Sequence, residues 1–404
     1  MKKILLLTLT LTLTALLIAC GSQEEALPTA VPQAELPAAT DPAPPTPLPP
    51  TATATPLPPP TIIESEPEPP TPTPTAEPEP EGISLFAPAD FGDNRSPFTG
   101  ELVDDPDTLN RRPIAVKLSN SPASYTRPQS GLNDADFVYE HTTEGSITRF
   151  TAIFYTHTPP RVGPIRSARL IDVELPAMYD AALAYSGASV GVNQRLNASD
   201  FSSRILRTNE PGYYRTGETD KPFEHTFYAR PELFWEAMEE RGQNRRPETG
   251  TALSFSSMPP DGGQPGSVGR INYNWTLVEW VYDETNGRYY RWTDGEPHLD
   301  GNTLEQVNVA NVIMLSPLHV EDASICEESR DGVCIHLSVQ IQIWGNGNGL
   351  VLRDGQLYEV IWQREARNDT LTFTDAAGNP FPLQIGNSWV QLIPSWLRDP
   401  VSVE

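Results

Sequence analysis

The stretch DFVYEHTTEGSITRFTAIFY (136–155) decides the fold class, because it holds two mostly apolar segments around a polar one. Residues 136–140 and 148–155 are short and rich in β-branched and aromatic residues, which is typical of strands. Upstream, IAVKL (114–118) is a further largely apolar segment, and the turn formers of RPQSGLNDAD separate it from this pair. The sequence therefore predicts three strands here.

Helical features follow these strands. After RVGP the apolar positions fit a helical stripe approximately, with a break near Pro176. The segment AALAY (181–185) predicts a buried strand, and PELFWEAMEERG (231–242) predicts a helix with proline in its first turn and glycine at its end. This mixture predicts an α/β domain over residues 82–250.

The pattern changes after a loop rich in proline and glycine, residues 243–269. Beyond it, alternating strands are punctuated by turn dipeptides such as Asn286-Gly287 and Asp354-Gly355. We expect a mostly β domain over 268–404, a sandwich or open barrel, and α+β architecture overall. The run GNGNG (345–349) predicts a tight turn and not a phosphate loop, because no Lys-Ser/Thr pair follows it.

The first twenty residues, MKKILLLTLTLTLTALLIAC, combine two lysines, an apolar run and Cys20. This pattern predicts a secretory signal whose end, Leu-Ile-Ala-Cys, resembles the bacterial lipobox, so that Cys20 would carry acyl chains; an ordinary anchor helix is the alternative. Residues 21–81 hold 20 of the chain's 43 prolines and no lysine or arginine. That composition predicts a disordered stalk. The stalk could hold the folded region at a distance from the membrane, or it could be a spacer whose length is not important.

Charge and cysteine content restrict the partners and the compartment. The formal charge is −25, and residues 82–404 hold 43 acidic and 26 basic residues, which excludes nucleic acid as an expected partner. Cys326 and Cys334 flank a polar loop, and in an exported chain they favour a local disulfide; a metal pair is the weaker alternative. We expect no cofactor.

The best candidate site is RVGPIRSAR (161–169), with three arginines in nine residues of an acidic chain. If Pro164 begins a helix, Arg166 and Arg169 lie on one face and can clamp a carboxylate, phosphate or sulfate beside the helix end. Internal pairing is the competing interpretation and the commoner outcome, because the acidic residues Glu140, Glu144 and Asp172 lie close in the sequence. The candidate binding residues are Glu140, Glu144, Arg149, Arg166, Arg169 and His225.

A catalytic interpretation uses some of the same residues. Glu140 and Glu144 could act as general acid and base if their environments separate their pKa values, with His225 carrying the proton; a histidine satisfied within a loop or core is the alternative. Neither Ser167 nor Ser189 lies in a nucleophile elbow, and His141, Glu144 and His225 lack a metal-binding spacing. Seven tryptophans of the β region could stack on sugars or anchor a peptide, although core packing is commoner.

Several of these motifs together resemble the YerB-like bacterial lipoproteins. The motifs are RPIAVKLSN, RPQSGLNDADFVYE, GPIRSAR, MYDAALAYSGAS and EHTFY, then YDETNGRYYRW, WGNGNGLVLRDGQ and IGNSWVQLIP, spread in order over about 110–395. The resemblance implies an α/β N-terminal part, a separate C-terminal part and no established activity. Where the family pattern has a histidine, this chain has Ser186.

Two functions are compatible with these observations. The first is a lipoprotein on the outer face of the cytoplasmic membrane that binds an anionic or peptide ligand and contacts an envelope protein or a cell-wall component. The second is an envelope hydrolase or transferase that uses Glu140 or Glu144 with His225. The predicted stalk and the lack of a nucleophile motif favour the binding protein.

Overall fold

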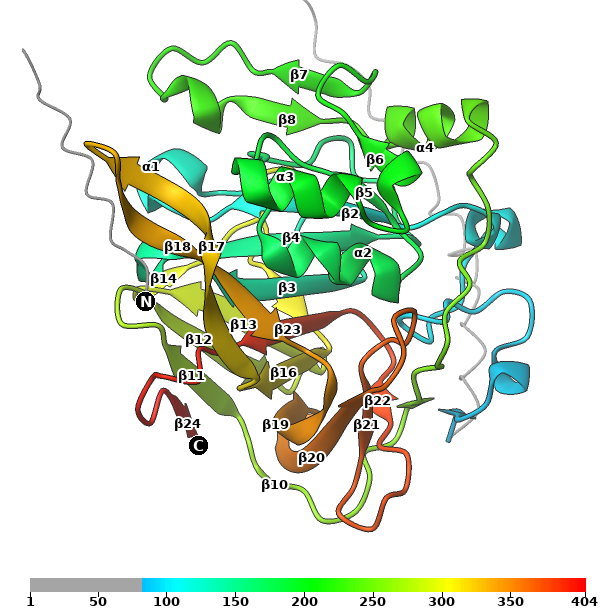
Figure 1. Cartoon of the computed structure of the whole chain (residues 1–404). Coiled ribbons are helices and arrows are strands. Elements are labelled where there is room, and N and C mark those ends of the chain that lie inside the picture. The colour runs from blue at the N-terminus through cyan, green and yellow to red at the C-terminus, as the bar shows by residue number, and fades with distance from the viewer. Residues whose placement is uncertain (1–81) are drawn as a thin grey trace, which may run out of the picture. The chain divides into compact units, whose positions relative to one another are not determined.

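The computed structural model describes residues 82–404, and these form an α+β fold, as predicted (Figure 1). The predicted signal peptide (1–20), Cys20 and the predicted stalk (21–81) lie outside the described residues. Within 82–404, no helix has the length and apolarity needed to cross a membrane.

An 11-stranded sheet forms the centre, in the order β10-β20-β19-β16-β23-β3-β4-β2-β5-β6, with β21 paired to β20. Its strands from the N-terminal region are β2 (Ile114–Ser119), β3 (Phe137–Thr142), β4 (Thr148–Phe154), β5 (Ala182–Ala184) and β6 (Ile205–Leu206). Its strands from the C-terminal region are β10 (Gln264–Pro265), β16 (Asn311–Leu315), β19 (Gly345–Arg353), β20 (Gln356–Arg364), β21 (Thr372–Thr374) and β23 (Ser388–Leu392). The segments predicted as strands at 114–118, 136–140, 148–155 and 181–185 all lie in this sheet.

The two regions meet at the parallel pair of β23 and β3, in which Gln391 lies opposite Glu140 and Leu392 opposite His141. Strands from both sides of the predicted boundary at 250–268 therefore hydrogen-bond within one sheet. The division of the chain into domains at 250–268 remains a prediction from the sequence. The consequence for function is that residues far apart in the chain share the faces and ends of this sheet.

The C-terminal region adds a six-stranded antiparallel sheet, and smaller sheets complete the fold. The six strands are β11 (Val268–Asn272), β12 (Leu277–Asp283), β13 (Arg288–Thr293), β14 (Glu296–Pro297), β15 (Asn308–Val309) and β24 (Val401–Val403). The smaller sheets consist of β1 (Ser84–Leu85), β9 (Phe255–Ser256) and β22 (Leu383–Gln384); β7 (Tyr213–Arg215) and β8 (Phe227–Ala229); and β17 (Leu318–Arg330) and β18 (Val333–Gln342).

The helices are short and lie mostly in the N-terminal region. The α-helices are α1 (Ala123–Thr126), α2 (Leu175–Met178), α3 (Val190–Asn197) and α4 (Pro231–Glu240). The 3₁₀ turns are η1 (Pro88–Phe91), η2 (Pro106–Asn110), η3 (Glu144–Ser146), η4 (Leu170–Val173), η5 (Ser202–Arg204) and η6 (Phe223–His225). The structure confirms the helix predicted over 231–242, whose proline is the first residue of α4.

Strand alternation divides the apolar residues between two cores. Along β3, Phe137 and Tyr139 face one core and Val138 faces the other, because successive side chains of a strand point to opposite faces. Both faces are covered, so β2, β3 and β4 are buried along their whole length. Polar side chains in these strands must therefore find partners inside the protein.

The helix predicted to begin at Pro164 is wrong. Residues 164–169 are extended, and the first helical turn after them is η4. The amide of Arg166 donates to the Lys117 carbonyl and the amide of Ile165 to the Phe227 carbonyl. The carbonyls that a helix would use are also engaged elsewhere, because Pro164 accepts from the Ser119 amide and Arg166 from the Ser186 amide. The segment therefore runs as an irregular strand beside β2 and β8.

The tight turn predicted at GNGNG is also wrong, because Gly345 to Gly349 belong to β19. A Cβ at Gly347 would lie 2.8 Å from the indole nitrogen of Trp362, so the strand requires glycine where this ring crosses it. The chain instead turns at Asp354-Gly355, as predicted, and both residues have positive φ.

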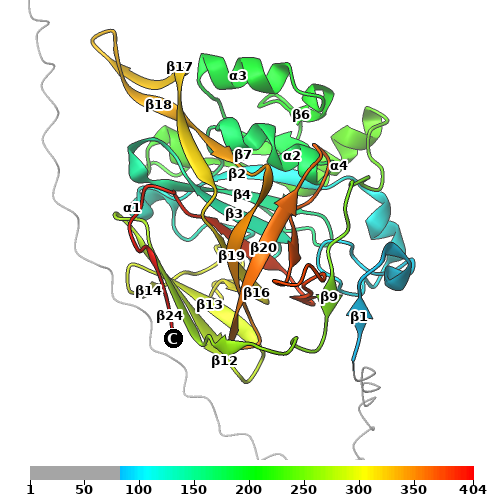
Figure 2. The ribbon, with the colours of Figure 1, turned by 60° about the horizontal axis from the view of Figure 1, so that its bottom comes forward.

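The hairpin of β17 and β18 extends from the C-terminal region to α3 (Figure 2). The predicted disulfide between Cys326 and Cys334 is present near its tip. Ile325 of β17 is buried against α3, where a Cβ at Gly191 would lie 2.6 Å from its side chain. The hairpin therefore contacts the end of the central sheet where the predicted site residues lie.

Candidate functional site

Four of the predicted site residues gather at one end of β3 and β4, with a fifth residue from the hairpin. We call Glu144, Arg149, Arg166, Arg169 and Glu327 the arginine cluster. Glu144 lies in the 3₁₀ turn between β3 and β4, Arg149 begins β4, and Arg166 and Arg169 come from the extended segment. Glu327 comes from β17, so the cluster combines both regions of the chain.

Glu144 accepts hydrogen bonds from both buried arginines. The Nε of Arg169 donates to Glu144 Oε2 at 2.6 Å, and its Nη2 donates to Oε1. The Nη2 of Arg149 is 3.4 Å from the same Oε1, while its Nη1 donates to the Ser167 carbonyl at 2.9 Å. A fork of two bonds to one carboxylate fixes its position, so Glu144 and Arg169 form the rigid part of the cluster.

Glu327 brings a second carboxylate to Arg169. Its Oε2 lies 3.6 Å from Arg169 Nε, and its Oε1 accepts a hydrogen bond from the hydroxyl of Ser189 at 3.2 Å. Ser189 is the N-cap residue of α3. A carboxylate in this position is stabilised both by the guanidinium and by the positive end of the helix dipole.

A second, fully buried ion pair lies deeper on the same face of the sheet. Lys117 Nζ is 2.8 Å from Asp172 Oδ2, and neither side chain is exposed. Thr151 donates to Asp172 at 2.8 Å, and the amide of Arg169 donates to the same carboxylate at 2.7 Å. Lys117 also contacts His141. Asp172 thus links the buried lysine to the backbone of the arginine cluster.

The ionisation of these groups is governed first by burial and then by the charges of their neighbours. Burial, and then the charge of Arg169, lower the pKa of Arg149 to about 9. Burial opposes ionisation of Glu144, but the hydrogen bond and charge of Arg169 outweigh it and lower its pKa to about 2. Burial lowers the pKa of Lys117 to about 8 despite Asp172. Burial thus disfavours every charge here, and the arginines offset this cost for the Glu144 carboxylate.

Arg166 and His225 form the outer edge of the site. Arg166 lies 4.0 Å from Glu224, and its side chain is 26% exposed. His225 is buried beside Tyr125, with ring centroids 5.7 Å apart, and its Nδ1 has no partner in the structure. Burial, followed by the charge of Arg166, lowers the pKa of His225. The imidazole is therefore neutral at pH 7.

Glu140 lies on the opposite face of the sheet from the cluster. Its Oε2 is 2.9 Å from Nη2 of Arg291 on β13, although the two groups are not aligned as a hydrogen bond, and both side chains are fully buried. Thr148 donates to its other oxygen at 2.8 Å. The structure therefore separates Glu140 from Glu144 and does not bring them together as an acid–base pair.

Other features of the sequence have separate positions. Arg161, the first arginine of RVGPIRSAR, donates to the Gly301 carbonyl and to Ser130, away from the cluster. Among the tryptophans, Trp280 and Trp389 are core residues, whereas Trp275 is 76% exposed. Residues 82–404 contain no group of three potential metal ligands.

Sequence reasoning missed Lys117 and Glu327 as members of this site. A lysine inside the apolar strand IAVKL is a signal that could have been used, because a buried lysine needs a paired carboxylate. Glu327 gives no comparable signal, since it is one of several acidic residues in a polar loop. Glu327 lies beside Arg169 because of the path that the hairpin takes in the folded chain.

The comparisons with known proteins agree with this architecture. Residues 98–244 match the N-terminal domain, and residues 270–390 the C-terminal domain, of the protein family of unknown function DUF3048. The Bacillus subtilis (strain 168) protein named “Putative lipoprotein YerB” is 30% identical over 306 residues, which is 74% of this chain and 86% of that protein. The crystal structure of the YerB protein from Bacillus subtilis matches with a TM-score of 0.63 and 27% identity, covering 77% of this chain and 99% of the other. The resemblance to YerB-like proteins is confirmed, and the chain belongs to the DUF3048 family.

Proposed function

We propose that the chain is an exported, lipid-anchored binding protein that holds an anionic group of an envelope ligand, such as a peptide carboxylate, in the arginine cluster. The observation that carries this proposal is the position of Glu327. A carboxylate supplied by a distant segment lies between Arg169 and the Ser189 hydroxyl at the start of α3. A ligand carboxylate has the same hydrogen-bonding needs, so it can take the place of Glu327.

The charges of the cluster support this exchange. Lys117 is paired with Asp172, and Glu144 is shared by Arg149 and Arg169. If Glu327 leaves, Arg169 loses its second carboxylate and the three arginines of the cluster retain one inner carboxylate, Glu144. The resulting excess of positive charge in a mostly buried position favours binding of an external anion.

The lipid anchor rests on the N-terminal sequence and on the name of the Bacillus subtilis relative. The signal pattern ending at Cys20 fits acylation of that cysteine, and two or more acyl chains give stable membrane anchoring. The proline-rich segment 21–81 would then separate the folded region from the outer face of the cytoplasmic membrane. The partner would be an envelope protein or a cell-wall component.

The alternative, a hydrolase or transferase using Glu140 or Glu144 with His225, receives less support. Glu140 is paired with Arg291 on the other face of the sheet. With a pKa of about 2, Glu144 is a weak base at neutral pH, because an efficient general base has a pKa near the working pH. The arrangement is better suited to binding an anion than to transferring a proton.

The test is anion titration of the full-length chain by calorimetry, with N-acetylalanine as the carboxylate probe and inorganic phosphate for comparison. Replacing Glu327 by Gln removes the competing charge and keeps the shape. We expect Glu327→Gln to bind N-acetylalanine about tenfold more tightly than the unaltered chain, the effect of one charge-assisted hydrogen bond. Adding Arg169→Ala to that variant should abolish the gain.

Glu328→Gln is the matched control, because Glu328 is the exposed neighbour on the same hairpin and makes the same change in net charge. It should leave the affinity unchanged. Equal affinities of Glu327→Gln, Glu328→Gln and the unaltered chain for both probes would overturn the proposal, as would a gain that survives Arg169→Ala. If phosphate binds more tightly than N-acetylalanine, the ligand of the arginine cluster is a phosphate and not a carboxylate.

A further inference from the structure

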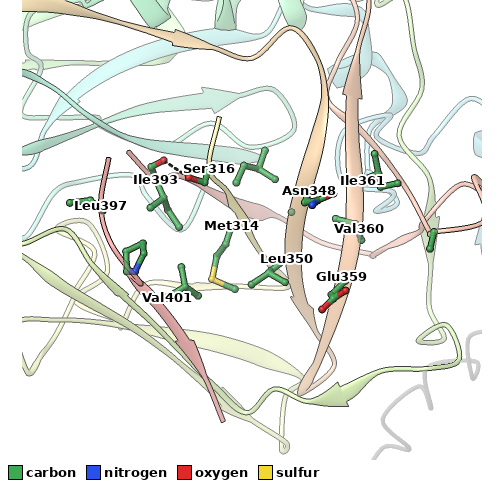
Figure 3. Close-up of a pocket in the computed structure, with 14 residues that line it drawn as sticks. Met314, Ser316, Asn348, Leu350, Glu359, Val360, Ile361, Ile393, Leu397 and Val401 are labelled. Carbon is green, nitrogen blue, oxygen red and sulfur yellow. Dashed lines mark hydrogen bonds between the residues drawn. The ribbon is translucent and has the colours of Figure 1, made fainter. Parts of the chain in front are cut away.

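An apolar cavity of about 490 Å³ lies between the central sheet and β24 of the six-stranded sheet (Figure 3). Met314 of β16 and Leu350 of β19 form one side, and Ile393, Leu397 and Val401 form the other. The close-up shows Met314 and Leu350 directed toward Val401 across this space. The volume lies within the range of about 300–1,000 Å³ typical of small-molecule sites.

The cavity exists because the two sheets separate along β19. At Leu352 they are in close contact, since a Cβ at Gly269 of β11 would lie 2.5 Å from the Leu352 side chain. Two residues earlier, Leu350 is only half-buried, and so is Val401 opposite it. Apolar surface that neither sheet covers remains accessible at this edge of the core, and its burial would stabilise a bound apolar group.

One charged side chain, Glu359, lines this apolar space. It lies beside Leu350 in the β19–β20 register and is exposed. Among residues 82–404, no basic group lies within 4 Å of its carboxylate, in contrast to Glu144 and Glu140. Asn348 lines the same cavity and offers a second oxygen acceptor. The polar part of the lining is therefore complementary to a cation that donates N–H bonds.

We infer that this cavity binds a small molecule with an apolar body and a cationic amine, the ammonium pairing with Glu359. The net charge of −25 adds attraction for a cation over the whole surface. This site is independent of the arginine cluster: Met314 and Leu350 pack with the core on the opposite face of the sheet from Lys117 and Arg169. The two sites would recognise groups of opposite charge.

The experiment compares n-octylamine, n-octanol and n-octanoate, which share a chain and differ in charge. Binding to the full-length chain is followed through methionine methyl resonances in isotope-labelled protein, with the Met314 signal assigned by Met314→Leu. We expect n-octylamine to shift the Met314 methyl and to bind about threefold more tightly than n-octanol, the scale of one exposed ion pair. The methyl of the buried Met178 should not move.

Two kinds of variant separate the charge from the cavity. Glu359→Gln should make n-octylamine and n-octanol bind equally, whereas Glu236→Gln, on the exposed side of α4, should not alter their ratio. Val401→Trp, or Leu397→Trp in the loop if the strand variant does not fold, should remove binding of all three probes. Tighter binding of n-octanoate than of n-octylamine, or a Met314 methyl that responds to none of the probes, overturns the inference.

Discussion

The two faces of the central sheet each carry a carboxylate paired with arginine, and the two pairs differ in what surrounds them. On one face, Glu140 meets Arg291 with both side chains fully buried. On the other, Glu144 meets Arg149 and Arg169 at the end of the strands, and its side chain is 15% exposed. Glu140 and Glu144 are four residues apart, yet one is enclosed by protein and the other lies near solvent.

The surroundings explain the difference. The Arg291 guanidinium lies 4.5 Å from the centre of the Trp389 ring, and its Nε donates to His298 at 3.0 Å. It thus connects β13 to the strand β3 at a site closed to solvent. The arginine cluster is covered by the hairpin of β17 and β18, which is paired only with itself as a sheet. The enclosed pair links the two regions, whereas in the arginine cluster the proposed exchange concerns Glu327, which the hairpin supplies.

The largest effect should come from breaking the enclosed pair. Arg291→Met leaves the Glu140 carboxylate buried without a counter-charge, and we expect the free energy of unfolding to fall by about 3–5 kcal/mol. Chemical denaturation of the full-length chain measures this change. The double variant Arg291→Met with Glu140→Gln should recover part of the loss, because it also removes the buried charge.

Arg195→Ala serves as its control, since Arg195 is 61% exposed and its ion pair with Asp322 spans 3.8 Å. Little change in stability is expected there. A loss for Arg291→Met no larger than that for Arg195→Ala would mean that the enclosed pair does not hold the two regions together.

An intermediate effect is expected at Glu144, and it depends on pH. The pKa of Glu144 falls from its ordinary value of 4.5 to about 2 in the folded chain. A carboxyl group with a depressed folded pKa stabilises the fold above pH 4.5 and loses this contribution as the pH falls toward 2. Glu144→Gln should therefore cost about 2–3 kcal/mol at pH 7 and progressively less below pH 4.5.

Urea denaturation at a series of pH values between 7 and 2 measures this prediction. The stability curves of the unaltered chain and of Glu144→Gln should converge in acid. Curves that stay parallel over the whole range would show that Glu144 is not ionised against the arginines.

The smallest effect is expected at the outer edge, where Glu224 is 4.0 Å from Arg166 and half exposed. Glu224→Gln should change the free energy of unfolding by less than about 0.5 kcal/mol. It should nevertheless lower the pKa of His225 further, because Glu224 raises that pKa while Arg166 lowers it. NMR titration of the His225 ring measures the shift, and Arg166→Gln should move it in the opposite direction. If the His225 pKa is unchanged in both variants, His225 does not interact with Arg166 and Glu224, and it is not part of this site.

Local patterns were sufficient for the strands and failed where a segment's partners are distant. The apolar segments at 114–118 and 148–155 are strands, as predicted, because their apolar and β-branched composition suits strands that are buried along their whole length. RVGPIRSAR was expected to start a helix, but its amides bond to β2 and β8. GNGNG was expected to turn, but it is a strand in which Gly347 makes room for Trp362. In both cases a tertiary contact outweighed local preference.

The candidate site shows the same limit. Arg149, Arg166 and Arg169 could be grouped from the sequence because they lie close along the chain, and the structure does bring them together. Ser189 and Glu327 are 138 residues apart, so only the folded hairpin places that carboxylate at α3. The separation of Glu140 from Glu144 depends on which strand face each occupies and on Arg291, which comes from the other region.

The sequence by itself determined the strand segments of the N-terminal region, the α+β class, the helix at 231–240 and the cysteine pair that closes the hairpin, because each depends on residues near one another in the chain. Only the tertiary structure decided that β3 pairs with β23, that Glu140 and Glu144 face different surroundings, and that a cavity opens beside Glu359. The physical reason is that burial and the pairing of charges depend on segments that meet only after folding, and short-range patterns carry no information about them.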